Sequence, residues 1–182
     1  MQPARRTRGF TLIEMLITVS LMGIVIALVA PSMRDLIATQ RVRSINSELV
    51  TDLQFARTEA VRRGFNVFIE FRTSPANTCY TIKVGGAACN CLRGPGLACN
   101  FAEDEIRTVL LPRRLDVALA ASSGAANVLL FSNENGRANP PGFRVDVAST
   151  RRGALRTTTN AAGRPAVCSP DGSITQVPRC ED

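Results

Sequence analysis

Residues 10–30 form the longest hydrophobic stretch of the chain and predict a helix that spans a membrane. Polar side chains interrupt this stretch at four positions: Thr11, Glu14, Thr18 and Ser20. A helix rises about 1.5 Å per residue, so a stretch of this length can cross the hydrocarbon of a bilayer. Three arginines precede it, and the positive-inside rule keeps such residues in the cytoplasm. We therefore expect residues 1–9 to be cytoplasmic and the chain after the helix to lie in the periplasm.

Two other kinds of segment share this pattern: a secretory signal and a plain single-pass anchor. A secretory signal has a shorter apolar core, although the end of the stretch, residues 27–32, resembles a weak cleavage site. Glu14 argues against both alternatives, because a carboxylate inside a membrane span is costly and is by default functional and paired. The exception is a carboxylate close enough to the interface to reach the headgroups.

Beyond the membrane the helix should continue as an amphipathic segment over residues 31–64. Pro31 is expected to kink it, because proline lacks a backbone donor and clashes with the preceding turn. Apolar residues then recur every three or four positions and form one stripe: Val42, Ile45, Leu49, Leu53, Ala56 and Ala60. Arg62 and Arg63 suit the end of a helix, and Gly64 suits the position after it. The stripe should pack on the domain that follows.

After residue 64 the hydrophobic period changes from 3.6 to 2, which predicts half-buried β-strands. The alternating segments are 67–72, 80–84, 115–119 and 143–147, with shorter runs at 106–111 and 128–132 and a weaker one at 154–159. Residues 85–104 and 133–142 carry turn chemistry and predict loops. Short turns without a second helix favour antiparallel pairing. The predicted fold class is α+β, with a long N-terminal transmembrane helix packed against antiparallel β-sheets of a domain over residues 65–182.

The composition gives little support for an enzyme. The chain has no histidine, and it lacks a Gly-rich phosphate loop and a G-x-S-x-G motif. The acidic cluster at 103–105 lies in a predicted loop without a partner motif. We expect no catalytic residue, no metal and no cofactor. The net charge of +7 falls to +4 if the three arginines before residue 9 are removed, so global charge is a weak argument for nucleic-acid binding.

Six cysteines follow the predicted membrane segment: Cys79, Cys89, Cys91, Cys99, Cys168 and Cys180. An even number beyond a membrane segment favours disulfides in an oxidising compartment. Zinc is the alternative, although the first four cysteines contain no C-x-x-C pair. The spacing alone does not select a connectivity.

The segment from Arg8 to Leu16, with the sequence RGFTLIEML, resembles the processing site of type IV pilins and type II secretion pseudopilins. In that family a prepilin peptidase removes a short basic leader after glycine, and the new N-terminal residue is N-methylated. The resemblance implies that residues 1–9 are a leader, that cleavage falls between Gly9 and Phe10, and that Phe10 is methylated. It also makes Glu14 the fifth residue of the mature chain, where the family keeps its glutamate.

The pairing of charges gives this glutamate a physical role. After cleavage Phe10 carries a charged amine at the edge of the hydrocarbon, and the Glu14 carboxylate of a neighbouring subunit can pair with it. Burying either charge alone is costly, so pairing favours one axial stagger between subunits. We expect Glu14 to set the register of assembly.

A second resemblance lies in the later part of the chain. The segments 130–137 and 142–145, followed by Gly163-Arg164, are similar to the GspH/FimT group of minor pilins and pseudopilins. This implies a minor subunit of a type IV pilus or type II secretion pseudopilus, at the tip or in initiation; a major subunit is a further alternative. The implied partners are the prepilin peptidase/N-methyltransferase, other minor and major pilins, and an inner-membrane assembly platform. Pilins often close a C-terminal loop with a disulfide, which favours Cys168 with Cys180 and leaves the other four cysteines to pair among themselves.

Arginines are concentrated between residues 142 and 165: Arg144, Arg151, Arg152, Arg156 and Arg164, against one acid, Asp146. They indicate either a solvated basic face or a DNA-binding patch. FimT-like minor pilins take up DNA through a Gly-Arg-x-Arg motif, which would make this chain a DNA-binding minor pilin used in natural transformation. Here the segment reads Gly163-Arg164-Pro165-Ala166, so the second arginine is missing. Aromatic residues for base stacking are also scarce.

Overall fold

The computed structural model describes residues 10–86, 88–122, 127–151 and 153–181, and for residues 29–32 it describes the backbone only. The chain divides into two compact units, residues 1–37 and 38–182. Helix α1 (Leu12–Arg63) contributes its first part to one unit and its second part to the other. By length and composition, none of the described helices could cross a bilayer alone, whereas Leu12–Leu28 and Met33–Arg63 could do so together as a bent pair.

Helix α1 ends where its sequence predicts. Arg62 and Arg63 occupy its last turn, where their charge complements the helix dipole. Gly64 follows with φ of 71°, and its amide donates to the carbonyl of Ala60 at 3.1 Å. A left-handed residue in this position is a common way to end a helix, and glycine adopts it without steric cost.

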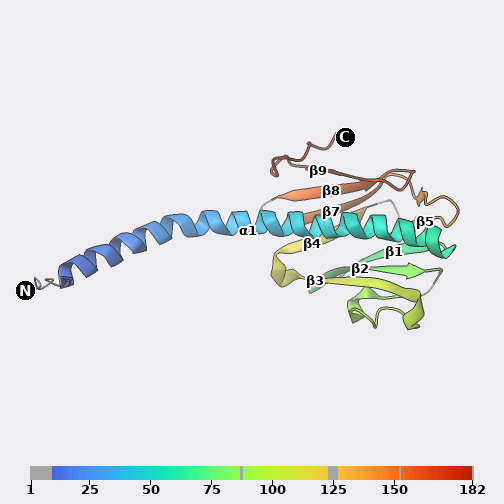
Figure 1. The fold of residues 1–182 in the computed structure, drawn as a ribbon, viewed down its shortest axis with the longest axis horizontal. Coiled ribbons are helices and arrows are strands. Elements are labelled where there is room, and N and C mark those ends of the chain that lie inside the picture. Colours follow the sequence, from blue (N-terminus) through green and yellow to red (C-terminus); the bar gives the residue numbers. More distant parts are fainter. Residues whose placement is uncertain (1–9, 87, 123–126, 152, 182) are drawn as a thin grey trace, which may run out of the picture. The chain divides into compact units, whose positions relative to one another are not determined.

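In the described part of residues 38–182 the strands form two antiparallel sheets. The first has the order β3 (Glu105–Pro112), β2 (Asn77–Val84), β1 (Val67–Thr73), β5 (Val128–Phe131) and β6 (Ala138–Asn139). The second has the order β4 (Val117–Ser122), β7 (Phe143–Ser149), β8 (Ala154–Thr159) and β9 (Pro165–Cys168). The second part of α1 lies across both sheets, with β7 and β8 on one side of its axis and β2 and β3 on the other (Figure 1).

One hydrophobic core joins the helix to both sheets. The predicted helix stripe is buried at Val42, Leu49, Leu53, Ala56 and Ala60, with Ile45 partly buried. The inward side chains of β1, β5, β7 and β8 meet this stripe from the two sheets. Residues 38–182 therefore contain a complete core of their own, as an independently folding domain requires. The α+β fold class expected from the sequence is confirmed.

Strand β2 departs from its predicted half-buried pattern. Six consecutive residues, from Thr78 to Lys83, are buried. The inward face carries Tyr80 and Ile82, and the outward face is covered by the segment 85–104, whose short helix η1 (Cys91–Arg93) packs over β1, β2 and β3. Period-2 alternation predicts which face points inward, but it does not reveal that a loop covers the other face.

Other boundaries also differ from the predictions. Leu115 is not in a strand: it ends the short helix η3 (Arg113–Leu115), and Asp116 then takes a left-handed φ of 57°, so β4 begins at Val117. Strands β6 and β9 have no counterpart in the sequence-based prediction. β6 lies inside the segment predicted as a loop, next to a cis Asn139–Pro140 bond. Strands this short carry too few residues for alternation to be recognised.

Candidate assembly and binding surfaces

The first part of α1 presents an apolar surface to its surroundings. Its large hydrophobic side chains from Leu12 to Leu28 are exposed, and Phe10, just before the helix, is 78% exposed. The Thr18 hydroxyl donates to the carbonyl of Met15 and the Ser20 hydroxyl to that of Leu16, at 2.9 and 2.7 Å. Each hydroxyl is therefore satisfied within the helix, which suits a nonaqueous environment.

Glu14 lies in the first turn of α1. Its amide donates to the Thr11 hydroxyl at 3.4 Å, so Thr11 caps the start of the helix. The Glu14 side chain is exposed, and its carboxylate forms no ion pair with any described residue. The carboxylate is therefore open to a group from another molecule. Gly9 lies outside the described residues, and so does the side chain of Pro31.

A partly buried polar cluster ties α1 to the first sheet. The Tyr80 hydroxyl donates to Asp52 Oδ2 at 2.7 Å, and Arg107 Nε lies 3.0 Å from the same oxygen. Arg107 also reaches Glu48 Oε1 at 2.6 Å. Burial raises the pKa of Asp52, although the Tyr80 hydrogen bond and the Arg107 charge act in the opposite direction. Burial, followed by the charge of Asp52, raises the pKa of Tyr80 far above its usual range.

A second buried contact ties α1 to the other sheet: the Thr157 hydroxyl donates to Asn46 Oδ1 at 2.8 Å. The sequence-based interpretation missed both contacts. A signal for Asn46 was available, because this position falls in step with Val42, Leu49 and Leu53 on the apolar stripe. A polar residue at such a position must find a partner, since a buried polar group without one is costly.

The two segments that resemble the GspH/FimT group lie together against α1. Arg57 Nε donates to the carbonyl of Gly136 at 3.1 Å, and the amide of Ala138 donates to the carbonyl of Ala161 at 3.2 Å. A Cβ placed on Gly163 would collide with the Gly136 carbonyl and press on Arg57. These glycines therefore allow a close approach of two turns and one helix side chain.

A groove lies beside this junction. It has a volume of about 440 Å³ and is lined by Gln54, Arg57, Thr58, Gly163, Arg164 and Pro165. Arg164 is exposed, and its amide donates to Asn160 Oδ1, which shapes the turn before β9. Two guanidinium groups line this one groove, and arginine can hold an anion through several donors at once.

The described arginines between residues 142 and 165 are used in different ways. Arg156 makes two hydrogen bonds to the Asp146 carboxylate, at 2.7 and 3.0 Å, and Arg151 lies 3.5 Å from Asp116. Arg144 is exposed on β7, and Arg164 lines the groove near α1. Arg152 lies outside the described residues. The charges of Arg151 and Arg156 are thus largely neutralised by acidic side chains of the same domain.

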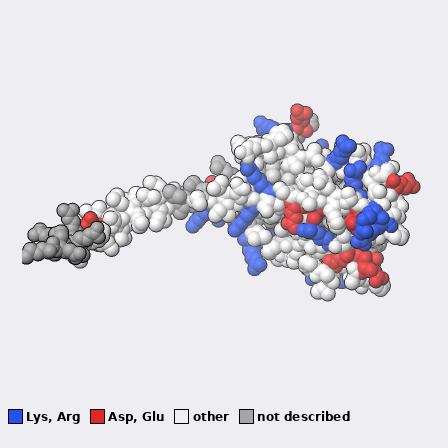
Figure 2. Space-filling view, viewed as in Figure 1, with Lys and Arg blue, Asp and Glu red and all other residues white. Residues whose placement is uncertain are grey.

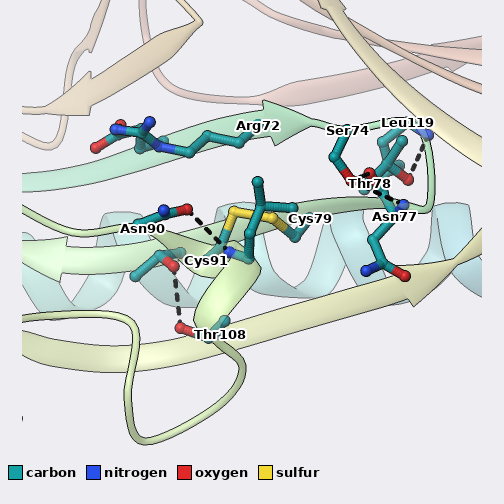
Figure 3. Close-up of a disulfide and its surroundings, with 12 residues drawn as sticks. Arg72, Ser74, Asn77, Thr78, Cys79, Asn90, Cys91, Thr108 and Leu119 are labelled. Atoms are coloured by element: carbon teal, nitrogen blue, oxygen red, sulfur yellow. Dashed lines mark hydrogen bonds and ion pairs between the residues drawn. A yellow bond between two sulfur atoms is a disulfide. The ribbon is translucent and has the colours of Figure 1, made fainter.

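All six cysteines form disulfides: Cys79–Cys91, Cys89–Cys99 and Cys168–Cys180. The C-terminal pair favoured by the pilin resemblance is present, and the first four pair among themselves. The Cys79–Cys91 bond joins β2 to η1, where Asn90 Oδ1 accepts from the amide of Leu92 (Figure 3). It holds the 85–104 segment on the outer face of the first sheet. Cysteines paired in this way leave no thiolate for the zinc alternative.

Comparison with known proteins gives two family matches. A model described as type II transport protein GspH matches residues 46–167. A model described as the prokaryotic N-terminal methylation motif matches residues 4–30. No curated protein matches the chain.

Two crystal forms of the type IV minor pilin FimU from Pseudomonas aeruginosa strain PAO1 have a similar fold. One covers 75% of this chain and 94% of the FimU chain, at 18% identity and a TM-score of 0.52. The other covers 73% and 97%, at 19% identity and a TM-score of 0.48. The first supports the architecture of a long helix packed on antiparallel sheets. With the GspH match spanning more than half of its length and the methylation motif at its N-terminus, the chain belongs to the GspH family of minor pilins and pseudopilins.

Proposed function

We propose that this chain is a minor subunit of a type IV pilus or type II secretion pseudopilus, acting at the tip or in initiation and without catalytic activity. A prepilin peptidase/N-methyltransferase cleaves it between Gly9 and Phe10 and methylates Phe10. The mature chain is held in the inner membrane by residues 10–30, with its domain in the periplasm. It then joins other minor and major pilins at an inner-membrane assembly platform.

The observation that carries this proposal is the first turn of α1, where the exposed Glu14 carboxylate lies among exposed apolar side chains. Such a helix needs a surrounding of lipid or of other helices. Within that surrounding, a carboxylate gains most from an opposite charge, and the Phe10 amine of a neighbouring subunit supplies one. Pro31 would add a kink that adjusts the helix to its neighbours.

The test compares Glu14→Ala with Glu134→Ala, which removes an exposed acid from a turn of the periplasmic domain. The fraction of each subunit in sheared filaments is measured against the fraction left in the membrane. Glu14→Ala should stay in the membrane, whereas Glu134→Ala should enter filaments like the wild type. Equal incorporation of both variants would remove the proposed role of Glu14. Mass spectrometry of the wild type should find methylated Phe10 as the first residue.

A second candidate function is DNA binding during uptake, and the groove that holds Arg57 and Arg164 favours it. The paired arginines Arg151 and Arg156 offer less to a phosphate backbone, so binding should be weak and should disappear as salt rises. A mobility shift of duplex DNA at low salt tests this with residues 38–182. Arg164→Ala should abolish the shift and Arg156→Ala should reduce it less. No shift for the wild-type domain at low salt would exclude this function.

A further inference from the structure

The short helix η3 is fixed beside α1 at the end of the domain where α1 enters it. Arg41, in the first turn of α1 inside this domain, donates from Nη1 to the carbonyl of Leu115 at 3.3 Å. The carbonyl of Asp116 accepts from the amide of Thr150 at 3.2 Å, and the Asp116 carboxylate lies 3.5 Å from Arg151 Nε. The end of η3 is therefore held between α1 and the turn that joins β7 to β8.

This attachment leaves two arginines of η3 facing outward. A 3₁₀ helix has about three residues per turn, so its three side chains point in three directions. Leu115 packs against the hydrophobic core, whereas Arg113 and Arg114 are exposed. Arg41, which bonds to the end of η3, is exposed as well. We name these three residues the collar: Arg41, Arg113 and Arg114.

The collar carries three positive charges that acidic side chains do not neutralise. None of its guanidinium groups forms an ion pair with a residue in the part of the chain that the structure describes. Asp116, the acid that follows η3 in the chain, is already paired with Arg151. Figure 2 shows basic side chains gathered around α1 where it enters the domain. A partner that binds this surface should therefore be anionic.

The collar also lies close along the chain to the predicted membrane segment. Arg41 comes eleven positions after Ala30, the last residue of the apolar stretch. A helix of this length rises about 16 Å, and any bend shortens that distance. Headgroups occupy roughly the first 5–7 Å outside the hydrocarbon, and charges act over about 8 Å at physiological ionic strength. With the length of an arginine side chain added, the collar is within reach of the headgroups.

We propose that the collar binds anionic phospholipid headgroups of the membrane that anchors α1. Arginines near an anionic leaflet are attracted to it, and a guanidinium group can hold a phosphate through two parallel hydrogen bonds. This contact holds the domain against the periplasmic face of the membrane before the chain is assembled. The inference rests on the proposed membrane anchoring and adds a lipid partner for the domain.

Vesicle binding by residues 38–182 provides the test. At low salt the domain should float with vesicles that contain phosphatidylglycerol and should not float with vesicles of phosphatidylcholine alone. Arg113→Gln combined with Arg114→Gln should lower the ratio of bound to free domain roughly 25-fold, because each arginine near an anionic surface contributes about fivefold. The matched control combines Arg93→Gln with Arg137→Gln, which removes the same charge from exposed arginines elsewhere on the domain.

Three results would overturn the inference. One is equal binding to the two kinds of vesicle, or binding to neither. Another is a loss in the control variant as large as the loss in the collar variant. The third is a collar variant that loses duplex-DNA binding but keeps vesicle binding, because these arginines would then serve a nucleic acid.

The full chain in bilayer discs provides a second readout. Hydrogen exchange of the backbone amides in residues 113–116 should be slower in discs that contain phosphatidylglycerol than in neutral discs. Residues 133–137 serve as the internal control and should exchange equally in both. Equal exchange of residues 113–116 in the two kinds of disc contradicts a lipid contact in the anchored protein.

Failure of the lipid contact can be distinguished from failure of the assembly function. A chain that enters filaments although its domain ignores anionic vesicles lacks the lipid contact and keeps the assembly function. A chain whose domain binds anionic vesicles but never enters filaments keeps the lipid contact and lacks the assembly function.

Discussion

The hydroxyl of Tyr80 on β2 donates to the carboxylate of Asp52 on α1, with 2.7 Å between the two oxygens. Asp52 is only 2% exposed, and it comes from a helix whose neighbouring stripe is apolar. The same carboxylate oxygen faces Arg107 of β3 at 3.0 Å. One helix residue therefore holds two strands of the first sheet, and through it the helix acquires a defined position on that sheet.

Removing Asp52 should destabilise the domain more than removing the Tyr80 hydroxyl. Asp52→Ala leaves a buried phenol without its acceptor and Arg107 without one of its partners, at a cost of about 2–3 kcal/mol. Tyr80→Phe leaves Asp52 paired with Arg107 and should cost about 1 kcal/mol. Urea unfolding of residues 38–182 measures both. Glu48→Gln, at the exposed side of the same cluster, is the control and should change stability little.

Glu59 should make the domain sensitive to acid. Hydrogen bonds from Arg62 lower the pKa of Glu59 from 4.5 to about 2 in spite of its burial. A folded-state pKa below the unfolded value gives stability that is present above pH 4.5 and is lost as the pH falls from 4.5 towards 2. Because Arg62 is largely exposed, we expect a contribution of about 1 kcal/mol. Glu59→Gln should have a flatter stability profile across this range than the wild type, whereas Glu134→Gln should follow the wild type.

Gly163→Ala should be more harmful than Gly142→Ala, although both glycines have φ of 74°. A Cβ at Gly142 meets nothing within 4 Å, so that variant carries only the left-handed penalty of about 1–2 kcal/mol. At Gly163 the added atom also collides with the Gly136 carbonyl and Arg57. The difference between the two midpoints of urea unfolding isolates the cost of opening this junction. Equal midpoints would mean that the turns of Gly136 and Gly163 can move apart without a measurable loss of stability.

The Cys79–Cys91 and Cys168–Cys180 disulfides should differ in their effect although each spans 12 residues. Chain entropy alone assigns both about 3 kcal/mol. Replacing Cys79 and Cys91 by serine should cost more, because it also releases the cover over the partly buried Lys83–Glu70 pair, whose charged atoms are 2.6 Å apart. Limited proteolysis should then cut within residues 85–104. In the Cys168/Cys180 double serine variant, cleavage should fall near the C-terminus instead.

Periodicity alone predicted much of the fold. The apolar stripe from Val42 to Ala60 shows which side chains of α1 are buried, and the alternation in β1 and β7 shows the same for those strands. Each pattern lies within one element, so it can be recognised from consecutive residues. The same patterns missed β9, which is too short for alternation to be recognised. They also misjudged β2, because its outer face is covered by residues that come later in the chain.

The N-terminal signals can be identified from the order of residues alone: an apolar helix interrupted by Glu14, and a basic stretch ending at Gly9 and Phe10. These are contiguous in the chain and need no folding to be recognised. The partners of the arginines and of the buried polar groups, in contrast, become visible only in the folded chain. Arg156 meets Asp146 across two strands, Arg164 joins Arg57 beside α1, and Asp52 meets Tyr80. Each of these pairs is made by chain folding, because electrostatic and hydrogen-bond energies depend on distances in space and not on separation along the sequence.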